Sequence, residues 1–333
     1  MSRPFLSVFL LPYLPTIDNF FDMKVYTDNI NFAQKLLKKS IAPELIDSKS
    51  IKSEFHPLFN RLFGSGNIYF CEVESLPIWT NLFIIQHAAL SHYDLVSEFC
   101  RDNKPIPDGS LFMAGAGERF HGFKGRAWAG LLGNIHLVAY IEPRQPIEHI
   151  SVSLTVTSAV SVVQTIDMIK NGDINAGIKW INDILIGDAK VGGVLAFTQA
   201  EGDMITAAAI GIGLNVEAVP QIEKSDFIPR AGSIGQFFSD SEAVGLNNVF
   251  GNLIIRLGEN IQLLLTGNYG RLIELYRSRS VIIGRQVEIR PDTNDLEEGN
   301  IYSGRVITIG DDLGLYLEGV REPVLSGRLV LLR

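Results

Sequence analysis

Residues 178–214 read IKWINDILIGDAKVGGVLAFTQAEGDMITAAAIGIGL, and this stretch decides the fold. Its apolar and branched residues fall into short runs, which is typical of strands, with tight turns at Gly187-Asp188 and Glu201-Gly202 between them. Three short strands are predicted: Ile178 to Ile186, Val191 to Phe197 and Ile205 to Leu214. The sequence therefore places three consecutive strands in the second half of the chain.

The segments around these strands follow an α/β pattern that begins near Leu111. Ile135 to Ile141 is an almost wholly apolar strand, and the apolar residues from Val152 to Ile169 recur at helical spacing. Downstream, Asn248 to Leu265 and Arg271 to Arg279 are predicted to be helices. The predicted fold class is therefore α/β, in the broader sense α+β, with no internal repeat.

The first hundred residues carry weaker patterns. Asn29 to Lys39 (NINFAQKLLKK) predicts an amphipathic helix, and Asn67 to Val73 (NIYFCEV) predicts a strand. From Trp79 to Phe99 the apolar residues are spaced as in a helix. A winged-helix DNA reader needs three helices with a basic recognition helix, which we do not find, so we expect no DNA-binding role.

The hydrophobic pattern changes again near the end of the chain. After Gly284 the period becomes two and turn residues are dense, which predicts a small β-barrel appended to the main unit. We therefore predict three parts: an N-terminal extension of unassigned role over 1–65, a main domain over 66–280 and the barrel over 281–333. We expect removal of the barrel to leave the main domain folded.

Composition excludes several classes of protein. The 333 residues are 46% apolar and 20% charged, which is typical of a globular chain, and the net charge of −8 disfavours nucleic-acid binding through bulk charge. The only cysteines, Cys71 and Cys100, form neither a disulfide framework nor a cysteine-rich zinc site. The apolar run Phe5 to Leu14 has 10 residues and contains Pro12, whereas a bilayer crossing needs about 20. We expect a soluble, cytoplasmic protein without a membrane partner.

A glycine-rich loop, AGAGERFHGFKGRAW, runs from Ala114 to Trp128. Glycines allow backbone N–H groups to approach an anion closely, and the interleaved Lys and Arg residues would neutralise its charge. The loop matches neither the Walker pattern nor the dinucleotide fingerprint. A flexible surface loop with solvated charges is the alternative interpretation.

Three shorter motifs follow the loop: Lys179-Trp180-Ile181-Asn182-Asp183, Lys190-Val191-Gly192-Gly193 and Gly211-Ile212-Gly213-Leu214-Asn215. The Asn-Asp pair either serves chemistry or turns the chain into a hairpin. Lys190 either points its ammonium into a cleft that binds phosphate or carboxylate, or extends from a sheet edge into solvent. The glycines of the last motif indicate that another group comes close to the strand, and Asn215 either reads an adenine edge or caps a turn.

Taken in order, the loop ending in tryptophan and the three motifs resemble the catalytic domain of biotin protein ligases over residues 70–333. The resemblance implies a mixed sheet flanked by helices, like a class II synthetase, with a C-terminal SH3-like β-barrel. It implies that ATP and biotin give biotinyl-adenylate with Mg²⁺, and that the biotinyl group passes to a lysine of a biotin carboxyl carrier-type domain. It names no protein metal ligand and leaves a homodimer open.

The resemblance also implies roles for individual residues. Lys190 would contact the acid carboxylate and the phosphate, and Asp183 would lie near the reacting acyl phosphate, so these two are the expected catalytic residues. Trp128 would lie against the adenine. The other expected binding residues are Asn182 and Asn215 beside the adenine, Lys124 and Arg126 in the phosphate loop, Thr80 and Asn81 at the biotin pocket, and Gly122, Gly125, Lys179, Gly192 and Gly193.

The loop departs from the family pattern GRGRxGR, because Phe120, His121 and Phe123 occupy three of its expected positions. Phenylalanine rings that pack inward would favour an acid less polar than biotin. A lipoate or other acyl-acid ligase is therefore one alternative, and a non-catalytic binder of biotin or an adenylate is another. Retention of Lys190 and Asp183 argues against the non-catalytic alternative, and acid-dependent exchange of pyrophosphate into ATP discriminates among the three.

Overall fold

The structure, a computed structural model, describes residues 22–38, 41–74, 76–169, 175–223, 225–227, 230–238, 244–291 and 300–332. Its helices are α1 (Ile30–Leu37), α2 (His56–Phe63), α3 (His92–Arg101), α4 (Ser153–Asp167), α5 (Leu246–Leu265) and α6 (Tyr269–Ser278). Short 3₁₀ turns lie at Ser48–Ser50, Ser53–Phe55, Phe123–Gly125 and Ile234–Gln236. None of the helices in these ranges is both long and apolar enough to cross a membrane.

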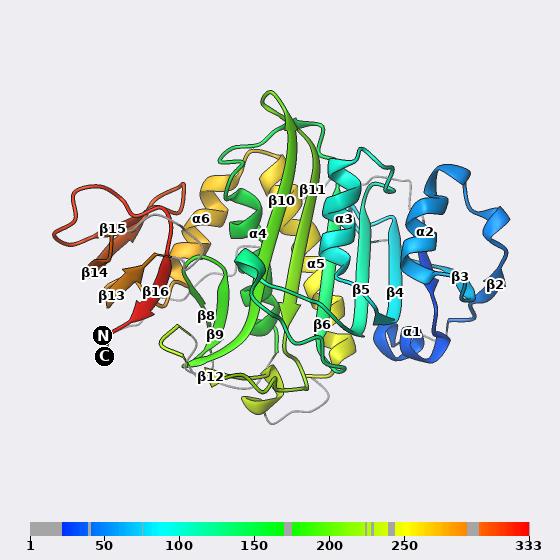
Figure 1. Cartoon of the computed structure of the whole chain (residues 1–333), viewed down its shortest axis with the longest axis horizontal. Coiled ribbons are helices and arrows are strands. Elements are labelled where there is room, and N and C mark those ends of the chain that lie inside the picture. The colour runs from blue at the N-terminus through cyan, green and yellow to red at the C-terminus, as the bar shows by residue number, and fades with distance from the viewer. Residues whose placement is uncertain are drawn as a thin grey trace, which may run out of the picture.

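The strands of the described ranges form a large mixed sheet and a smaller antiparallel one (Figure 1). The main sheet contains β1 (Met23–Thr27), β2 (Glu44–Ile46), β3 (Ile68–Val73), β4 (Asn81–Ala88), β5 (Ser110–Gly117), β6 (Ile135–Ile141), β7 (Gln145–Pro146), β8 (Ala176–Lys179), β9 (Asp183–Ile186), β10 (Ala189–Glu201), β11 (Met204–Leu214) and β12 (Arg230–Ala231). Its order is β2-β3-β1-β4-β5-β6-β11-β10-β9-β8, with β7 beside β11 and β12 beside β10. The smaller sheet, in the order β15-β14-β13-β16, contains β13 (Gln286–Arg290), β14 (Tyr302–Ile309), β15 (Leu315–Leu317) and β16 (Arg328–Leu331).

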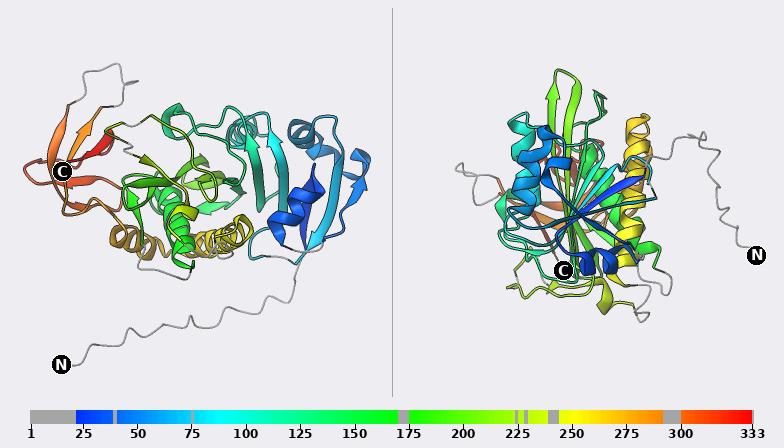
Figure 2. Two further views of the ribbon diagram at one scale, coloured as in Figure 1. Left: turned by 90° about the horizontal axis from the view of Figure 1, so that it is seen from below. Right: turned by 90° about the vertical axis from the view of Figure 1, so that its right-hand side faces the viewer.

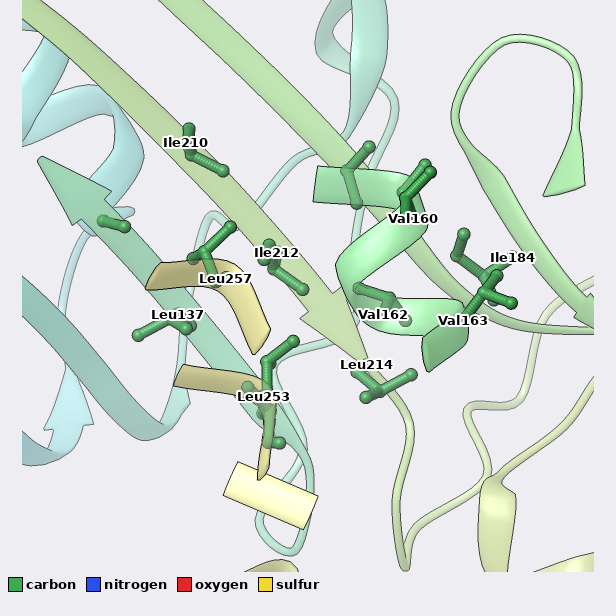
Figure 3. Close-up of a cluster of buried hydrophobic side chains, with 14 of the residues drawn as sticks. Leu137, Val160, Val162, Val163, Ile184, Ile210, Ile212, Leu214, Leu253 and Leu257 are labelled. Atoms are coloured by element: carbon green, nitrogen blue, oxygen red, sulfur yellow. The ribbon is translucent and has the colours of Figure 1, made fainter. Parts of the chain in front are cut away.

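Helices cover both faces of the main sheet (Figure 2). Helices α2 and α3 pack on one face over an aromatic-rich cluster, whereas α1, α4 and α5 pack on the other over the larger apolar core. Figure 3 shows part of that larger core, where Ile210 and Ile212 of β11 meet Leu253 and Leu257 of α5 and Val160 of α4. This three-layer arrangement confirms the predicted mixed sheet flanked by helices.

Most of the predicted elements are confirmed. The helix expected over 29–39 is α1, which begins after Asn29 because the side chain of Asn29 accepts the N–H of Phe32 and so caps the helix. The expected strands at 67–73, 135–141, 191–197 and 205–214 correspond to β3, β6, β10 and β11. The expected helices correspond to α4, α5 and α6. Residues 39 and 5–14 lie outside the described ranges.

The helix expected from Trp79 to Phe99 is wrong. Residues 81–88 form β4, which runs parallel to both β1 and β5, and only α3, beginning after Ser91, is helical. Leu82 through Ile85 are all buried because helices cover both faces of β4. A strand buried on both faces is a continuous apolar run without alternation, so spacing alone does not separate it from a buried helix.

The single strand expected from Ile178 to Ile186 is also wrong. The chain forms a hairpin of β8 and β9 that turns at Trp180–Asn182, so Lys179 lies opposite Asp183 in the register. The polar pair Asn182-Asp183 marks this turn, which was one of the two interpretations of the motif.

The N-terminal segment contributes to the main sheet. Strand β1 lies between β3 and β4, antiparallel to the former and parallel to the latter. The boundary expected near residue 65 stays a prediction, and the two strands before it, β1 and β2, belong to the main sheet. The C-terminal part is β-structured, as expected from the period of two, and forms the four-stranded antiparallel sheet at the red end of the chain in Figure 1.

Candidate functional site

Strand β11 carries large side chains on one face and glycines on the other, and the glycine face forms the floor of a cavity. Ile210, Ile212 and Leu214 point toward α4 and α5, while Gly211 and Gly213 point the opposite way, because successive side chains of a strand alternate between faces. The cavity occupies the space above these glycines, on the face covered by α3. Ser91, His92 and Tyr93 line one end, and Asn182, Asp183 and Lys190 line the other.

Aromatic rings lie directly on the two glycines. A Cβ atom on Gly213 would be 2.6 Å from the indole of Trp128, and one on Gly211 would be 2.9 Å from the ring of Tyr93. Any side chain at either position would therefore displace a ring, which explains why glycine alternates with isoleucine in this strand.

A buried histidine fixes the orientation of Trp128. The indole Nε1 donates to Nδ1 of His136 at 3.2 Å, and Nε2 of His136 donates to the Leu131 carbonyl at 3.1 Å. An indole can only donate, so the neutral imidazole uses one nitrogen as acceptor and the other as donor. Burial lowers the pKa of His136 to about 4, in keeping with this neutral form.

The glycine-rich loop folds as an irregular hairpin beside the cavity. Backbone bonds join Gly117 N–H to Gly130 O at 3.0 Å and Trp128 N–H to Phe120 O at 2.9 Å. The tip at Phe123–Gly125 includes two residues with positive φ, 54° at Lys124 and 73° at Gly125. The segment therefore lies beside the cavity as an irregular hairpin whose tip is exposed.

The two phenylalanines of the loop behave differently. Phe120 packs inward over Gly117 and Gly130, and its ring centroid is 5.1 Å from that of His136. Phe123 remains 40% exposed, with the guanidinium carbon of Arg126 5.9 Å from its ring centroid. Both rings line the cavity, but only Phe120 packs inward in the way that the sequence suggested for the pair.

His121 ties the loop to α3. Its Nε2 lies 2.7 Å from Oδ1 of Asp94, in the first turn of that helix, and Nδ1 lies 3.1 Å from the Gly122 carbonyl. Burial opposes protonation, but the hydrogen bonds to Asp94 and to the Gly122 carbonyl, together with the charge of Asp94, outweigh it and raise the pKa of His121 above its ordinary value. The loop is thus held against α3 by a charge-assisted contact.

The charged end of the cavity is an ion pair between neighbouring strands. Nζ of Lys190 lies 2.5 Å from Oδ1 of Asp183, and 5.9 Å from the ring centroid of Trp128. The pairing of β9 with β10 shifts by one residue between Lys190 and Gly192, and such a bulge re-aims the side chain beside it. Asn182 is fixed by the bond from its Nδ2 to Val194 O at 2.7 Å.

Lys179 lies in a smaller neighbouring cavity. Its Nζ donates to the carbonyl of Phe227 at 2.5 Å, and its side chain is almost fully buried. Burial lowers the pKa of Lys179 to about 8; the charge of Asp183 opposes this shift, and the nearby cations add to it.

The structure brings together seven of the expected site residues. Gly122, Arg126, Trp128, Asn182, Asp183, Lys190 and Gly193 all line the main cavity. Lys124 and Gly125 lie exposed at the loop tip. Gly192 faces Leu214 on the opposite side of the sheet.

Three expected binding residues are placed elsewhere. Asn215 is buried behind the cavity, where its amide donates to Gly232 O and accepts from Asn134. Thr80 and Asn81 lie at the start of β4, where the Thr80 hydroxyl donates to Asp108 O. The cavity instead lies beyond the other end of that strand.

Among the polar and aromatic residues of the cavity, sequence reasoning missed Ser91, His92, Tyr93 and His136. The first three begin α3, which was hidden inside the longer helix expected over 79–99. The serine was the available signal, because its side chain accepts from Asp94 N–H and so marks a helix start. No local pattern indicated His136, which lies within an apolar strand.

Comparison with known proteins agrees with this geometry. Residues 114–215, which contain the loop, the ion pair and the glycine floor, match the model of the biotin/lipoate A/B protein ligase family. This part of the chain is therefore similar to that family. The matched region ends at Asn215, so it holds the loop and the three motifs but not the smaller C-terminal sheet.

Individual relatives extend the likeness over more of the chain. The "Bifunctional ligase/repressor BirA" of Bacillus subtilis is 28% identical over 236 residues, which cover 71% of this chain and 69% of the relative. A "Biotin--[acetyl-CoA-carboxylase] ligase" of Paracoccus denitrificans is 29% identical over 118 residues, 35% of this chain and 48% of that protein. The structure of the biotin protein ligase from Aquifex aeolicus in complex with biotin and ATP aligns with a TM-score of 0.56 and 22% identity, covering 77% of this chain and all of that one.

Proposed function

We propose that this protein is an ATP-dependent ligase that adenylates biotin and transfers the biotinyl group to a lysine of a carrier protein domain. The observation that carries the proposal is the Lys190–Asp183 pair at one end of an apolar cavity floored by glycines. Such a cavity accepts an acyl chain and presents its carboxylate to a fixed ammonium. The match of residues 114–215 to the family model and the similarity to the named relatives support the same reaction.

In the first step a carboxylate oxygen of the acid attacks the α-phosphorus of ATP. The new O–P bond replaces the bond from the α-phosphorus to the bridging oxygen, whose electron pair leaves with pyrophosphate. Negative charge concentrates at the phosphorus in the transition state, and the ammonium of Lys190 stabilises it. Asp183 holds that ammonium in place through the 2.5 Å contact.

In the second step a lysine amine of the carrier attacks the acyl carbon of the adenylate. A C–N bond forms, the acyl C–O bond breaks, and AMP leaves with the electron pair while the amine loses a proton. The inward ring of Phe120 and the His121–Asp94 contact keep the loop over the cavity, which limits access of water to the adenylate.

One observation favours an acid with a polar head over a wholly apolar chain. Nδ1 of His92 is buried beside the cavity and has no hydrogen-bond partner among the described residues. Burial lowers the pKa of His92 to about 4, so its ring is neutral near pH 7. A ureido ring such as that of biotin would supply a partner, whereas octanoate would leave this nitrogen unsatisfied.

Mg²⁺ would lower the charge of the phosphates when ATP is bound. Mg²⁺ usually takes one or two carboxylates together with substrate phosphates. Asp183 is the carboxylate that lines the cavity within the described ranges, which also hold no cluster of three His, Cys, Asp or Glu residues. These residues fit a Mg²⁺ that arrives with ATP, with Asp183 as its protein ligand.

Several finer features belong to the same proposal. We assign the main unit to the class II synthetase-like type and the C-terminal sheet to the SH3-like type, and we place Trp128 against the adenine. Asn215, held by Gly232 and Asn134, would instead support the loops behind the cavity. A cytoplasmic location and a homodimer stay predictions.

The deciding experiment is acid-dependent exchange of labelled pyrophosphate into ATP, screened with biotin, lipoate and octanoate. We expect exchange with biotin alone, followed by labelling of a carrier domain when that domain is added. Exchange with lipoate or octanoate would reassign the acid. Tight biotin binding without exchange would instead identify a non-catalytic binder.

A further inference from the structure

The glycine-rich loop and the first turn of α3 meet at a charged contact. His121 of the loop and Asp94 of α3 are 27 residues apart in the chain, and Nε2 of the first lies 2.7 Å from Oδ1 of the second. His121 lines the main cavity, and so do the residues that begin α3. The contact therefore joins two walls of the same cavity.

The surroundings of His121 select its charged form. Nδ1 lies 3.1 Å from the Gly122 carbonyl, and Nε2 faces the Asp94 carboxylate. A carbonyl and a carboxylate both accept hydrogen bonds, so both ring nitrogens must donate, which only the imidazolium can do. His136 in the same cavity is the contrast, because one of its nitrogens accepts from Trp128. His121 therefore forms the full contact only when it holds its second proton.

Asp94 is the group of α3 whose charge acts on His121. Burial disfavours protonation of His121, but the hydrogen bonds to Asp94 and to the neighbouring carbonyl, with the charge of Asp94, raise its pKa. Tyr93 also faces the imidazole, with 6.3 Å between ring centroids, but burial raises the pKa of Tyr93 to about 12 and its phenol is neutral. Burial lowers the pKa of His92 to about 4, so this ring is neutral as well.

The other charged side chains that line the cavity within the described ranges have partners of their own. Arg126 donates from Nε to a backbone carbonyl at the loop tip, next to the exposed Lys124. Asp183 and Lys190 pair with each other at the other end of the cavity. Protonation of the imidazole therefore acts chiefly on the contact with α3.

The neighbours of His121 couple this contact to the rest of the loop. Phe120, the preceding residue, packs inward over Gly117, and its carbonyl accepts the N–H of Trp128 at 2.9 Å. His121 itself bridges to Ala127 on the other side of the irregular hairpin. Because these contacts join both sides of the hairpin, its release from α3 would let it move as a unit and uncover the cavity.

We propose that the His121–Asp94 contact is a proton-operated latch, which holds the loop over the cavity while His121 is protonated and releases it when the proton leaves. The identity of what the latch retains, biotin and the acyl-adenylate, rests on the proposed function. His121 is thereby a positioning residue, since it acts through the loop and not on the reacting atoms.

The direction of the pH dependence follows from the charged contact. Closing the loop favours proton binding, because the imidazolium pairs with Asp94 only in the closed state. This contribution to closure is complete below the ordinary histidine value near 6.5 and is lost as the pH rises through the raised pKa of His121. The loop should therefore open more often at alkaline pH.

The first test measures how fast biotin leaves the full chain between about pH 6 and about pH 9. We expect dissociation to become about threefold faster across this range, as a partly exposed ion pair contributes. His121→Gln keeps a donor but carries no charge, so it should release biotin at the fast rate at every pH, and Asp94→Asn should do the same. The matched control His87→Gln removes an exposed histidine whose Nε2 lies 3.9 Å from Glu118, and it should keep the pH profile of the unaltered chain.

The second test needs no ligand. Trypsin cuts after Lys124 at the exposed loop tip, and such cleavage requires the segment to open locally. The cleavage rate of Asp94→Asn divided by that of the unaltered chain cancels the pH dependence of the protease. This ratio should be about three at about pH 6 and fall toward one at about pH 9.

The same pH dependence of biotin release in folded His121→Gln and in the unaltered chain would overturn the latch. An equal flattening of the profile in His87→Gln would overturn it too, because the effect would then not depend on the contact with Asp94. A cleavage ratio that stays constant with pH would contradict the latch without any ligand. If the ratio varies as expected but biotin neither binds nor supports exchange, the latch stands and the proposed function fails.

Discussion

Single residues set the electrostatics of the site, and the Lys190–Asp183 pair shows how. The bulge in β10 directs Lys190 toward Asp183, and the indole of Trp128 lies close to the same ammonium. The ammonium is thereby fixed before substrate arrives, so little reorganisation is needed when charge develops at the phosphorus.

Lys190→Ala should therefore lower acid-dependent exchange by about a hundredfold, since the loss of one preorganised donor costs on the order of 3 kcal/mol. Melting temperature should change little, because the ammonium is partly exposed. Lys49→Ala, at an exposed lysine of the N-terminal segment, is the control and should exchange normally. Near-normal exchange by Lys190→Ala would remove this residue from the mechanism.

Two buried histidines make the folded protein less stable at acidic pH. Burial lowers the pKa of both His92 and His136 to about 4, below the ordinary value near 6.5. The unfolded chain therefore binds more protons between these values, so this contribution is complete above about pH 6.5 and is lost as the pH falls toward 4. At pH 4 each ring lowers the free energy of unfolding by up to about 3 kcal/mol relative to pH 7.

His136→Gln removes one of these groups while keeping an acceptor for Trp128. The variant should be less stable than the unaltered chain at pH 7 but should lose less stability between pH 7 and pH 4. Chemical denaturation across this range measures both quantities. Parallel losses in the two proteins would mean that His136 does not titrate in this way.

At the scale of elements, one face of β11 packs into the core and the other forms the floor of the cavity. The isoleucines stabilise the core with α4 and α5, and the glycines make room for the rings of Trp128 and Tyr93. A change on the glycine side should therefore affect the site more than the fold.

Gly213→Ala places a Cβ atom 2.6 Å from the indole of Trp128, which must move. We expect the KM for ATP to rise about tenfold, because base–aromatic stacking is worth roughly 1–3 kcal/mol. Gly251→Ala on α5 meets no atom within 4 Å and is the matched control. It should raise stability by about 0.5–1 kcal/mol and leave the KM unchanged. Equal KM values for ATP in the two variants would show that Trp128 does not contact the nucleotide.

The local hydrophobic pattern predicted most helices and strands, but it did not predict which elements that are distant in sequence lie next to each other. Alternation and helical spacing were enough for β11 and α5, because each has one face toward the core. They failed for β4, whose two faces are both covered, and for the turn at Trp180–Asn182, where the apolar residues Trp180 and Ile181 continue into the turn.

The candidate site was predictable only where its residues are close in sequence. The loop and the three motifs lie within about 100 residues, and their order could be read directly. His136 and the start of α3 join them only through the order β5-β6-β11-β10, which no local spacing encodes. Thr80 and Asn81 have suitable side chains, but they lie at the start of β4, and the cavity lies beyond the end of that strand.

At the scale of the whole molecule, the C-terminal sheet is more closely joined to the main unit than the sequence suggested. Nε1 of Trp180 donates to Leu313 O at 2.7 Å, and the hydroxyl of Tyr269 donates to Asp311 O at 2.5 Å. Apolar residues of the sheet, including Val287 and Leu315, belong to the same buried cluster as Trp180. The expectation that removal of residues 281–333 leaves the main domain folded therefore changes.

Deletion of residues 284–333 should destabilise the main unit, because it exposes Trp180 and leaves two buried donors without acceptors. Calorimetry of the full chain should give one transition, and the truncated chain should melt well below it. Trp180→Phe isolates the junction in the intact protein, since it keeps a ring but leaves the Leu313 carbonyl unsatisfied at a cost of about 1–3 kcal/mol. Tyr316→Ala, at an exposed position of β15, is the control and should stay within about 0.5 kcal/mol of the unaltered chain. A truncated chain that keeps the melting temperature of the full protein would show that the sheet is an independent appendage.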